Sequence, residues 1–275
     1  MFARNWIAGA AGIAVLALLP MIAQAQDLVF SVTEGVTYQA TPKEIRDKFE
    51  PIAEALARAL KRNVRIQLVP SYNDVRAGLK TQQYDIAYIH PAHVALEAIK
   101  SGRYKALAWT AGYTEYTASI MGDAKAPLKS FADIKGHSLV TPERDSITWA
   151  MINAMLRQEK FGPADVKVMN TRYQDAVPFY IEKGFAEYGA TAANAVVKHW
   201  TDKGGKVYAR SMPVPIKQII GSTRLPAADL DRIREILLSL SQNDAGQRAL
   251  APSGYKGFVA ANPEVERNVM AWLGI

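Results

Sequence analysis

The sequence of 275 residues predicts an α/β protein built from two lobes. Short runs of β-forming residues alternate with amphipathic helical stretches, a pattern typical of a parallel sheet covered by helices. This alternation occurs twice along the chain, whereas the residues after Pro226 have helical patterns only. Helices without strands do not build a third sheet domain, so we expect them to pack on the first lobe. The chain then crosses between the lobes twice.

The first 25 residues have the pattern of an export signal. Arg4 precedes an uncharged apolar run over residues 7–22, and Ala23-Gln24-Ala25 supplies the small residues that a signal peptidase accepts. A transmembrane anchor is the alternative, but the run is shorter than the roughly 20 residues needed to span a bilayer, and Pro20 interrupts it. We therefore expect cleavage before residue 26 and a periplasmic mature protein.

Residues 26–112 are predicted to form the first part of lobe 1. The clearest element is a helix over 41–61, where Thr41 can cap the first turn and Glu44 completes a capping box. Its apolar residues recur at helical spacing and form one stripe, which consists of Ile45, Phe49, Ile52, Leu56 and Leu60. The other predicted elements are strands at 28–33, 64–69, 84–89 and 104–110 and helices at 73–82 and 91–100.

Residues 113–210 are predicted to form lobe 2, and residues 211–275 to return to lobe 1. Lobe 2 is expected to contain strands at 117–121, 138–141, 166–169, 187–191 and 206–210 and helices at 146–158, 175–182 and 193–202. The returning segment has helical patterns at 229–241, 245–250 and 263–273. The crossings are expected at 111–116, where Gly112 and aromatic residues follow a strand, and at 211–215, where two prolines stiffen the chain.

Composition limits the kinds of function. Lys and Arg number 33 against 26 Asp and Glu, a net charge of +7, or 32 − 26 = +6 once Arg4 is removed with the signal. A moderate positive charge favours small anions through long-range steering. The basic residues are scattered, so we expect no nucleic-acid partner. The absence of cysteine excludes disulfides, thiolate metal sites and cysteine nucleophiles.

Polar and aromatic residues follow most of the predicted strands. Ligands of open α/β sheets bind beyond the carboxyl ends of the strands, so these residues are candidates for a polar small-molecule site. Those after the lobe 1 strands are Thr33, Glu34, Thr37, Tyr38, Ser71, Tyr72, Asn73, His90, Pro91, Tyr113, Glu115 and Tyr116. Those after a lobe 2 strand are Thr171, Tyr173 and Gln174.

The segment 141–148 is the most informative part of lobe 2. Asp145 or Ser146 can cap the helix that follows, and the free backbone N–H groups of its first turn, with the hydroxyls of Ser146 and Thr148, form a donor cluster suited to an anion. The helix dipole adds a favourable field. A plain helix cap is the alternative interpretation.

Two other groups of residues have side chains suited to chemistry. His90 and His93 have a His-x-x-His spacing but no nearby carboxylate or thiolate ligands, so we expect no metal. His90 at the end of a strand can donate a hydrogen bond to a ligand, and a packed or surface histidine is the alternative. Four carboxylates are candidates for contact with a protonated oxyanion or a cationic group, namely Glu34, Glu115, Asp145 and Glu187. The alternative for each is a solvated or salt-bridged residue. No catalytic motif of the hydrolase, nucleotide-binding or zinc-protease type is present, and we expect neither catalytic residues nor a cofactor.

Four segments in order resemble the phosphonate-binding family of ABC-importer substrate-binding proteins. Residues 84–91 are similar to its D-I-A-aromatic-x-G-P signature, 131–136 to L-x-D-L-K-G, 211–215 to S-x-x-I-P, and 49–53 to F-x-P-L-A. The matches extend from about residue 28 to residue 259. The resemblance implies a type II periplasmic-binding-protein fold with two interlobe crossings, which closes on a small anion and delivers it to an inner-membrane ABC permease.

The resemblance also implies ligand-binding positions. They are Tyr72, His90, Tyr116, Ser146, Thr148, Tyr173 and Glu187, to which the strand-end pattern adds Tyr38 and Asp145. His90 stands where the family often has glycine, Tyr173 stands where it usually has histidine, and the anion loop keeps only two hydroxyls. These departures leave the choice open among phosphonate, phosphite, phosphate and another small solute.

Two other binding functions are alternatives: the protein is a sensor that docks on a histidine-kinase ectodomain, or it captures a metal. An enzyme is a third alternative. A related branch makes thiamin pyrimidine with a cysteine-rich motif, and the absence of cysteine from this chain argues against that activity. We expect a monomer.

Overall fold

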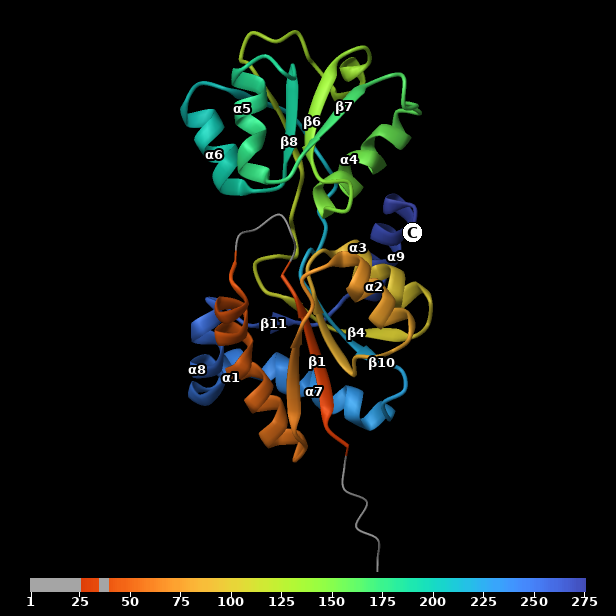
Figure 1. The fold of residues 1–275 in the computed structure, drawn as a ribbon, viewed down its shortest axis with the longest axis vertical. Coiled ribbons are helices and arrows are strands. Elements are labelled where there is room, and N and C mark those ends of the chain that lie inside the picture. The colour runs from red at the N-terminus through yellow and green to blue at the C-terminus, as the bar shows by residue number, and fades with distance from the viewer. Residues whose placement is uncertain (1–25, 35–39) are drawn as a thin grey trace, which may run out of the picture.

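The computed structural model describes residues 26–34 and 40–275. The predicted export signal and Tyr38 lie outside the described residues. The described chain forms two bodies, each built on its own β-sheet and stacked end to end (Figure 1). We call them lobe 1 and lobe 2.

The sheet of lobe 1 has the strand order β11-β4-β10-β3-β1-β2. Its strands are β1 (Leu28–Thr33), β2 (Val64–Leu68), β3 (Ile86–Ile89), β4 (Tyr104–Thr110), β10 (Gln218–Ser222) and β11 (Phe258–Val259). Strand β1 pairs in parallel with β2 and β3, whereas β10 lies antiparallel between β3 and β4. Thus a strand from the returning segment completes the middle of the sheet.

Helices cover both faces of the lobe 1 sheet. On one face lie α1 (Pro42–Leu60) and α7 (Ala227–Ser239), and on the other α2 (Tyr72–Lys80) and α3 (Ala92–Lys100). The Thr41 side chain accepts from the Glu44 backbone N–H, and the Glu44 carboxylate accepts from the Thr41 backbone N–H. The predicted capping box therefore forms. The predicted apolar stripe of α1 is buried at its Phe49, Ile52 and Leu56 positions. Further turns beside this face are η3 (Leu240–Gln242), α8 (Asp244–Leu250) and η4 (Ala251–Ser253).

The sheet of lobe 2 has the strand order β7-β6-β8-β5-β9. Its strands are β5 (Ser119–Gly122), β6 (Ser138–Pro142), β7 (Lys167–Thr171), β8 (Tyr188–Thr191) and β9 (Lys206–Arg210). Its helices are η1 (Phe131–Ile134), α4 (Ile147–Gln158), η2 (Gln174–Ala176), α5 (Val177–Glu182) and α6 (Asn194–Asp202). Helices α5 and α6 pack on one face, and α4 packs on the other.

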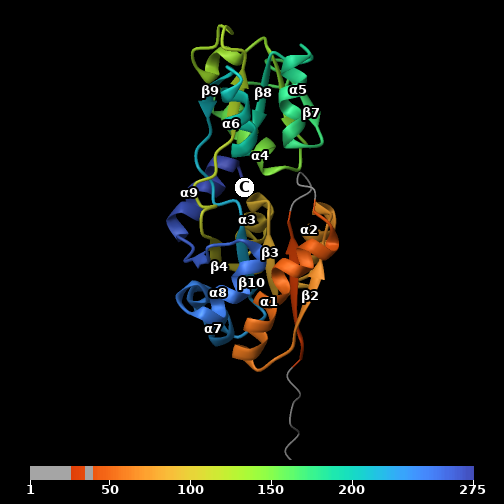
Figure 2. The same cartoon turned by 90° about the vertical axis from the view of Figure 1, so that its left-hand side faces the viewer.

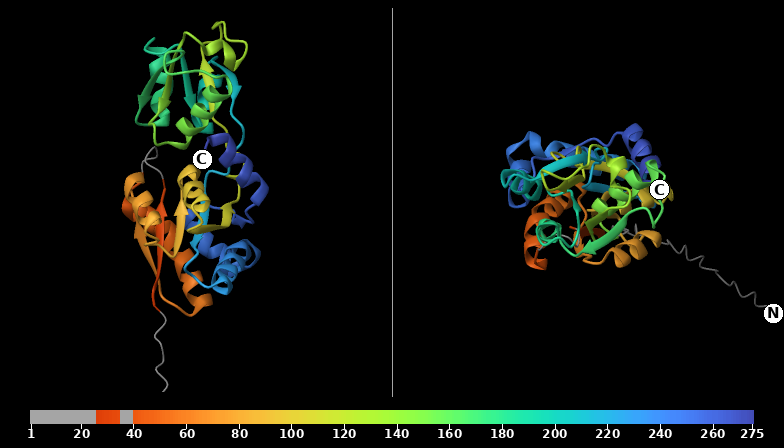
Figure 3. Two further views of the ribbon diagram at one scale, coloured as in Figure 1. Left: turned by 90° about the vertical axis from the view of Figure 1, so that its right-hand side faces the viewer. Right: turned by 90° about the horizontal axis from the view of Figure 1, so that it is seen from above.

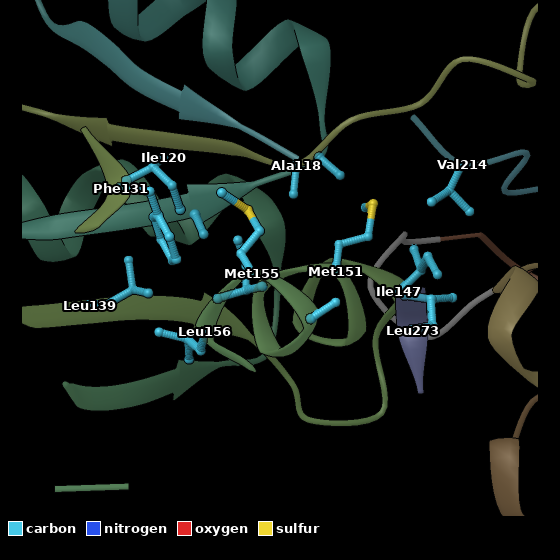
Figure 4. Close-up of a cluster of buried hydrophobic side chains, with 14 of the residues drawn as sticks. Ala118, Ile120, Phe131, Leu139, Ile147, Met151, Met155, Leu156, Val214 and Leu273 are labelled. Atoms are coloured by element: carbon cyan, nitrogen blue, oxygen red, sulfur yellow. The ribbon is translucent and has the colours of Figure 1, made fainter. Parts of the chain in front are cut away.

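Two segments connect the lobes, and they pair with each other. Tyr116 in the first segment and Val214 in the second form an antiparallel bridge. Helix α9 (Pro263–Leu273) lies beside this junction and packs on both α3 and α4 (Figures 2 and 3). Figure 4 shows one buried cluster that runs from β6 and α4 to Val214 and to Leu273 of α9. The architecture is therefore the predicted α/β fold with two interlobe crossings.

Three details differ from the sequence-based expectations. The chain has strands after residues 206–210, because β10 is inserted in the lobe 1 sheet and β11 extends its edge. The expectation of helices only after Pro226 is therefore wrong at β11. Helix α9 does not pack on lobe 1 alone, since its residues Val269 and Leu273 share a core with lobe 2. In the described part of the chain, no helix is long and apolar enough to cross a membrane.

Candidate functional site

The two sheets present their carboxyl edges to each other. In lobe 1, β1, β3 and β4 end where the crossings begin, and the antiparallel β10 starts at the same edge. In lobe 2, Ser119 at the start of β5 pairs with Thr191 at the end of β8 and with Arg210 at the end of β9. Both crossings therefore join the same two edges, and the residues beyond the strand ends lie at the junction of the lobes (Figure 1).

A largely buried polar cluster lies at the lobe 1 edge, with Tyr113 as its partly exposed member. It consists of Glu34, Tyr88, Tyr113, Lys217 and Tyr255, and we call it the lysine cluster. The Tyr255 hydroxyl donates to Glu34 Oε1 at 2.7 Å and lies 2.6 Å from the Tyr88 hydroxyl. Lys217 Nζ donates to the Tyr255 hydroxyl at 3.1 Å and lies 3.8 Å from Glu34 Oε2. The ammonium also lies 4.2 Å from the centre of the Tyr113 ring and 4.9 Å from that of Tyr255.

Burial controls the charges of the lysine cluster. Lys217 and Glu34 are each about nine-tenths buried, which is rare for charged residues unless they are paired. Desolvation lowers the pKa of Lys217, and the nearby Glu34 carboxylate opposes that shift. Desolvation also raises the pKa of Tyr88 and Tyr255, so both hydroxyls stay protonated. The cluster thus holds one buried cation, one buried carboxylate and neutral phenols.

His90 follows β3 and lies beside this cluster. Its Nδ1 is 2.9 Å from the backbone carbonyl oxygen of Glu34, and because a carbonyl oxygen only accepts, Nδ1 carries the proton. Burial, with a contribution from Lys217, lowers the pKa of His90 to about 3. A neutral ring that donates through Nδ1 has an acceptor at Nε2. The expectation that His90 donates to a ligand is therefore replaced, since this tautomer accepts at Nε2.

Lobe 2 contributes neutral donors at the start of α4. Ser146 is the N-cap, and its hydroxyl oxygen accepts from the backbone N–H of Trp149 at 3.1 Å. The hydroxyls of Thr148 and Thr191 donate to the Oε1 atom of Gln174 at 3.4 Å and 2.9 Å. Gln174 thus holds the end of β8 against the first turn of α4. The Thr148 hydroxyl is engaged inside lobe 2 and the Trp149 N–H is used by the cap, which leaves the backbone N–H groups of Ile147 and Thr148 as donors for an anion.

Two other predicted residues flank α4. Asp145 is exposed and pairs with Arg76 of lobe 1 at 3.4 Å, so it forms an ion pair between the lobes. Tyr173 follows β7 at the same edge as Ser146, and the guanidinium of Arg172 lies 5.2 Å from its ring centre. Arg172 is therefore a cation close to the interlobe edge that the sequence did not single out.

Glu187 lies apart from the other predicted residues. It precedes β8, at the amino edge of the lobe 2 sheet, whereas the crossings join the carboxyl edge. Its carboxylate accepts from His137 Nδ1 at 2.8 Å and from the backbone N–H of Ser138 at 2.9 Å. These hydrogen bonds lower the pKa of Glu187. They describe a carboxylate that ties β6 to β8 at the far end of lobe 2.

The two predicted tyrosines of the first half lie at lobe 1 and at the junction. Tyr72 is the first residue of α2 and is 5% exposed, and Tyr116 lies in the first crossing segment. In the described residues, no three His, Asp or Glu side chains gather in a way that would hold a metal ion. The imidazole of His93, the second member of the His-x-x-His pair, is 7% exposed, and burial lowers its pKa to about 3.

Sequence reasoning missed Lys217 and Tyr255. Lys217 precedes a strand instead of following one, and the strand itself, β10, was not predicted. Tyr255 follows a short turn after α8 and reaches the edge only through the fold. One signal was available, since Lys217 stands two residues after the second proline of the return crossing. A lysine at a predicted lobe junction is a candidate for an anion site.

A family model described as "ABC transporter, phosphonate, periplasmic substrate-binding protein" matches residues 35–265. No match was found among curated protein sequences. Three solved structures share the fold at low sequence identity. XAC2383 from Xanthomonas citri bound to ATP has a TM-score of 0.75 at 15% identity, over 90% of this chain and 96% of that chain.

The second is PhnD1 from Prochlorococcus marinus in complex with methylphosphonate, with a TM-score of 0.65 at 13% identity over 90% of this chain and 96% of that chain. The third is the periplasmic aliphatic sulphonate binding protein SsuA from Escherichia coli, with a TM-score of 0.60 at 13% identity over 90% of this chain and 85% of that chain. All three are similar to this chain over most of its length.

Proposed function

The chain belongs to the family of periplasmic substrate-binding proteins of phosphonate ABC transporters, and from this premise we propose that it captures a small oxyanion between the facing edges of its two lobes. The family works with an ABC permease, and we propose the same partner here. The protein binds its ligand without transforming it, acts as a monomer, and is exported by cleavage of residues 1–25.

The observation that carries the proposal is the buried ammonium of Lys217. Among the described residues, its one hydrogen-bond acceptor is the Tyr255 hydroxyl, although an ammonium can donate three hydrogen bonds. Burying a charge is costly unless it is paired and hydrogen-bonded. Lys217 therefore gains most from an anionic ligand that accepts its remaining N–H groups.

The lobe 2 edge supplies complementary groups. The first turn of α4 offers backbone N–H groups and the positive end of the helix dipole, which together favour an anion. Nearby at the lobe 1 edge, the hydroxyls of Thr33 and Thr110 are buried without a hydrogen-bond partner in the described residues. An oxyanion with several acceptor oxygens fits such a set of donors. We propose a site made of Lys217, Tyr72, His90, Tyr116, Ser146 and the backbone of Thr148, with Tyr38 as a further candidate.

Closure of the lobes around the ligand is part of the proposal. The chain passes between the lobes in two paired segments, and α9 packs against both lobes beside them, which is the layout of a hinge. The ion pair between Arg76 and Asp145 links the lobes at the residue that precedes the N-cap of α4. Closure buries the ligand and brings surfaces of both lobes together for the permease.

Calorimetric titration tests this function. The purified mature protein is titrated with methylphosphonate, phosphite, phosphate and ATP, and we expect saturable binding of at least one of the first three. Lys217→Met is expected to weaken that binding at least tenfold, because it removes the buried cation. Lys198→Met is the matched control, since Lys198 is exposed on α6 and pairs with Asp202.

The Lys217→Met variant also leaves Glu34 without its cation, so thermal melting of each variant accompanies the titration. If the single variant unfolds, the double variant Lys217→Met/Glu34→Gln, which removes both charges, is titrated in its place. Absence of binding by methylphosphonate, phosphite and phosphate, or unchanged binding in a folded Lys217→Met protein, refutes the proposal.

A further inference from the structure

The gap between Lys217 and Glu34 matches a ligand that still carries an acidic proton. We propose that this pair selects monoprotonated oxyanions, such as hydrogen phosphonate or hydrogen phosphite, over sulfonates of similar shape. This inference rests on the proposed function and concerns which ligands the same site accepts.

The first step is the distance between the two charged groups. Lys217 Nζ and Glu34 Oε2 are 3.8 Å apart, which is too long for a hydrogen bond. The ion pair is therefore open, with a donor on one side and an acceptor on the other. At this separation, one ligand oxygen could lie about 2.8 Å from both atoms and bridge them.

The second step is that Tyr255 cannot close the gap. Its hydroxyl proton is directed to Glu34 Oε1, and its oxygen receives the Lys217 N–H at 3.1 Å. Since the Tyr255 proton is used on Glu34, the 2.6 Å contact with Tyr88 is donated by Tyr88. The Tyr255 hydroxyl thus makes one donated and two accepted hydrogen bonds and has no capacity left.

The third step is the chemistry of a group that bridges the gap. An atom there must accept from the ammonium and donate to the carboxylate. The P–OH group of a monoprotonated oxyanion does both. A sulfonate oxygen accepts from Lys217 but places a second negative oxygen against Glu34 with no proton between them.

The surrounding groups reinforce this selection. Tyr88, Tyr113 and Tyr255 face the pair as neutral phenols, and the neutral ring of His90 donates to the Glu34 carbonyl oxygen. Lys48 of α1 is the other cation whose charge acts on Lys217. The edge of lobe 1 therefore holds one close cation, one carboxylate and a neutral imidazole. It carries no net positive charge to compensate a fully ionised ligand.

The test compares methylphosphonate with methanesulfonate, which differ in the acidic proton. We expect the wild-type protein to bind methanesulfonate at least about 10- to 100-fold more weakly, the range that corresponds to an unmet hydrogen bond to a charged group. In Glu34→Gln the side-chain amide can donate to an ionised oxygen, so the preference should shrink by about the same factor.

Glu266→Gln is the matched control variant. Glu266 is the other carboxylate in the described residues that is more than nine-tenths buried, and it lies on α9 outside the lysine cluster. Its substitution should leave the phosphonate-to-sulfonate ratio unchanged. A shrunken ratio in Glu266→Gln as well would overturn the assignment to Glu34.

Proton uptake gives a second readout that needs no variant. At a pH above the second ionisation of methylphosphonate, the free ligand is a dianion, and binding as the monoanion takes up a proton. Calorimetry in buffers of different ionisation enthalpy should show uptake approaching one proton per bound methylphosphonate and none for methanesulfonate. Binding without proton uptake, or equal affinity for both ligands, overturns the inference while leaving oxyanion capture intact. Absence of binding by every oxyanion overturns the proposed function itself.

Discussion

Two buried histidines should make the folded protein sensitive to acid. Burial lowers the pKa of both His90 and His93 to about 3, whereas an unfolded histidine titrates near 6.5. Between these values the unfolded chain binds more protons than the folded one. Stability is therefore fully present above pH 6.5 and is lost as the pH falls toward 3.

The magnitude follows from the linkage between protonation and unfolding. From pH 6.5 to pH 5.0, each histidine that stays neutral in the fold lowers the free energy of unfolding by about 2 kcal/mol, at about 1.36 kcal/mol per pH unit. Together the two residues should remove about 4 kcal/mol between pH 7.5 and pH 5.0. Carboxylates that titrate in the same range add to the total, so the measurement needs a difference between variants.

His93→Leu isolates one of the two residues. The Nδ1 atom of His93 has no hydrogen-bond partner in the described residues, and Arg76 is the charged group that acts on the ring. Leucine should therefore be tolerated at pH 7.5, with a change below about 1.5 kcal/mol. The loss of stability between pH 7.5 and pH 5.0 should be about 2 kcal/mol smaller than in the wild type.

The assay is urea denaturation at both pH values, with His199→Leu as the control. His199 is exposed on α6, so its substitution should leave the pH dependence as in the wild type. If His93→Leu loses as much stability as the wild-type protein on acidification, the buried neutral state assigned to His93 is incorrect.

Three further predictions concern other parts of the fold. Glu187→Gln should leave oxyanion affinity within twofold of the wild type in calorimetry and cost no more than about 1 kcal/mol of stability, because this exposed carboxylate lies away from the crossings; a loss of binding would return it to the site. Gly246→Ala should cost at least about 1–3 kcal/mol in thermal melting, since a Cβ there would lie 2.1 Å from the Leu240 carbonyl oxygen; an unchanged melting temperature would contradict this packing. Arg76→Ala should weaken ligand binding by no more than about fivefold, because its exposed ion pair with Asp145 links the lobes. The variant should also reduce the salt dependence of binding. Stronger binding would show that the ion pair opposes closure.

The fold could be predicted largely because its signals are local. The capping box of Thr41 and Glu44, the apolar stripe of α1 and the helix start at Ser146 each depend on residues within one or two turns. Strand β10 was missed because it is only five residues long, follows a proline-rich segment and is buried throughout. Its place in the sheet is set by β3 and β4, which no local pattern reveals.

The candidate site was predictable only in part. Residues that directly follow a parallel strand, such as Glu34 and His90, can be placed at the sheet edge from the sequence. Lys217 and Tyr255 reach that edge from the returning segment, and the contacts that join them to Glu34 depend on the tertiary fold. Glu187 is a predicted ligand residue that the structure places before β8, at the end of the strand opposite the crossings, and only the tertiary fold sets that position.

A structure of the mature protein with bound methylphosphonate tests the central claim most directly. A phosphonate oxygen is expected within about 2.7–3.2 Å of Lys217 Nζ, with other oxygens facing the backbone N–H groups at the start of α4. A protonated oxygen is expected between Lys217 and Glu34 Oε2. Density for the ligand at any place that does not contact both Lys217 and the first turn of α4 would contradict the account.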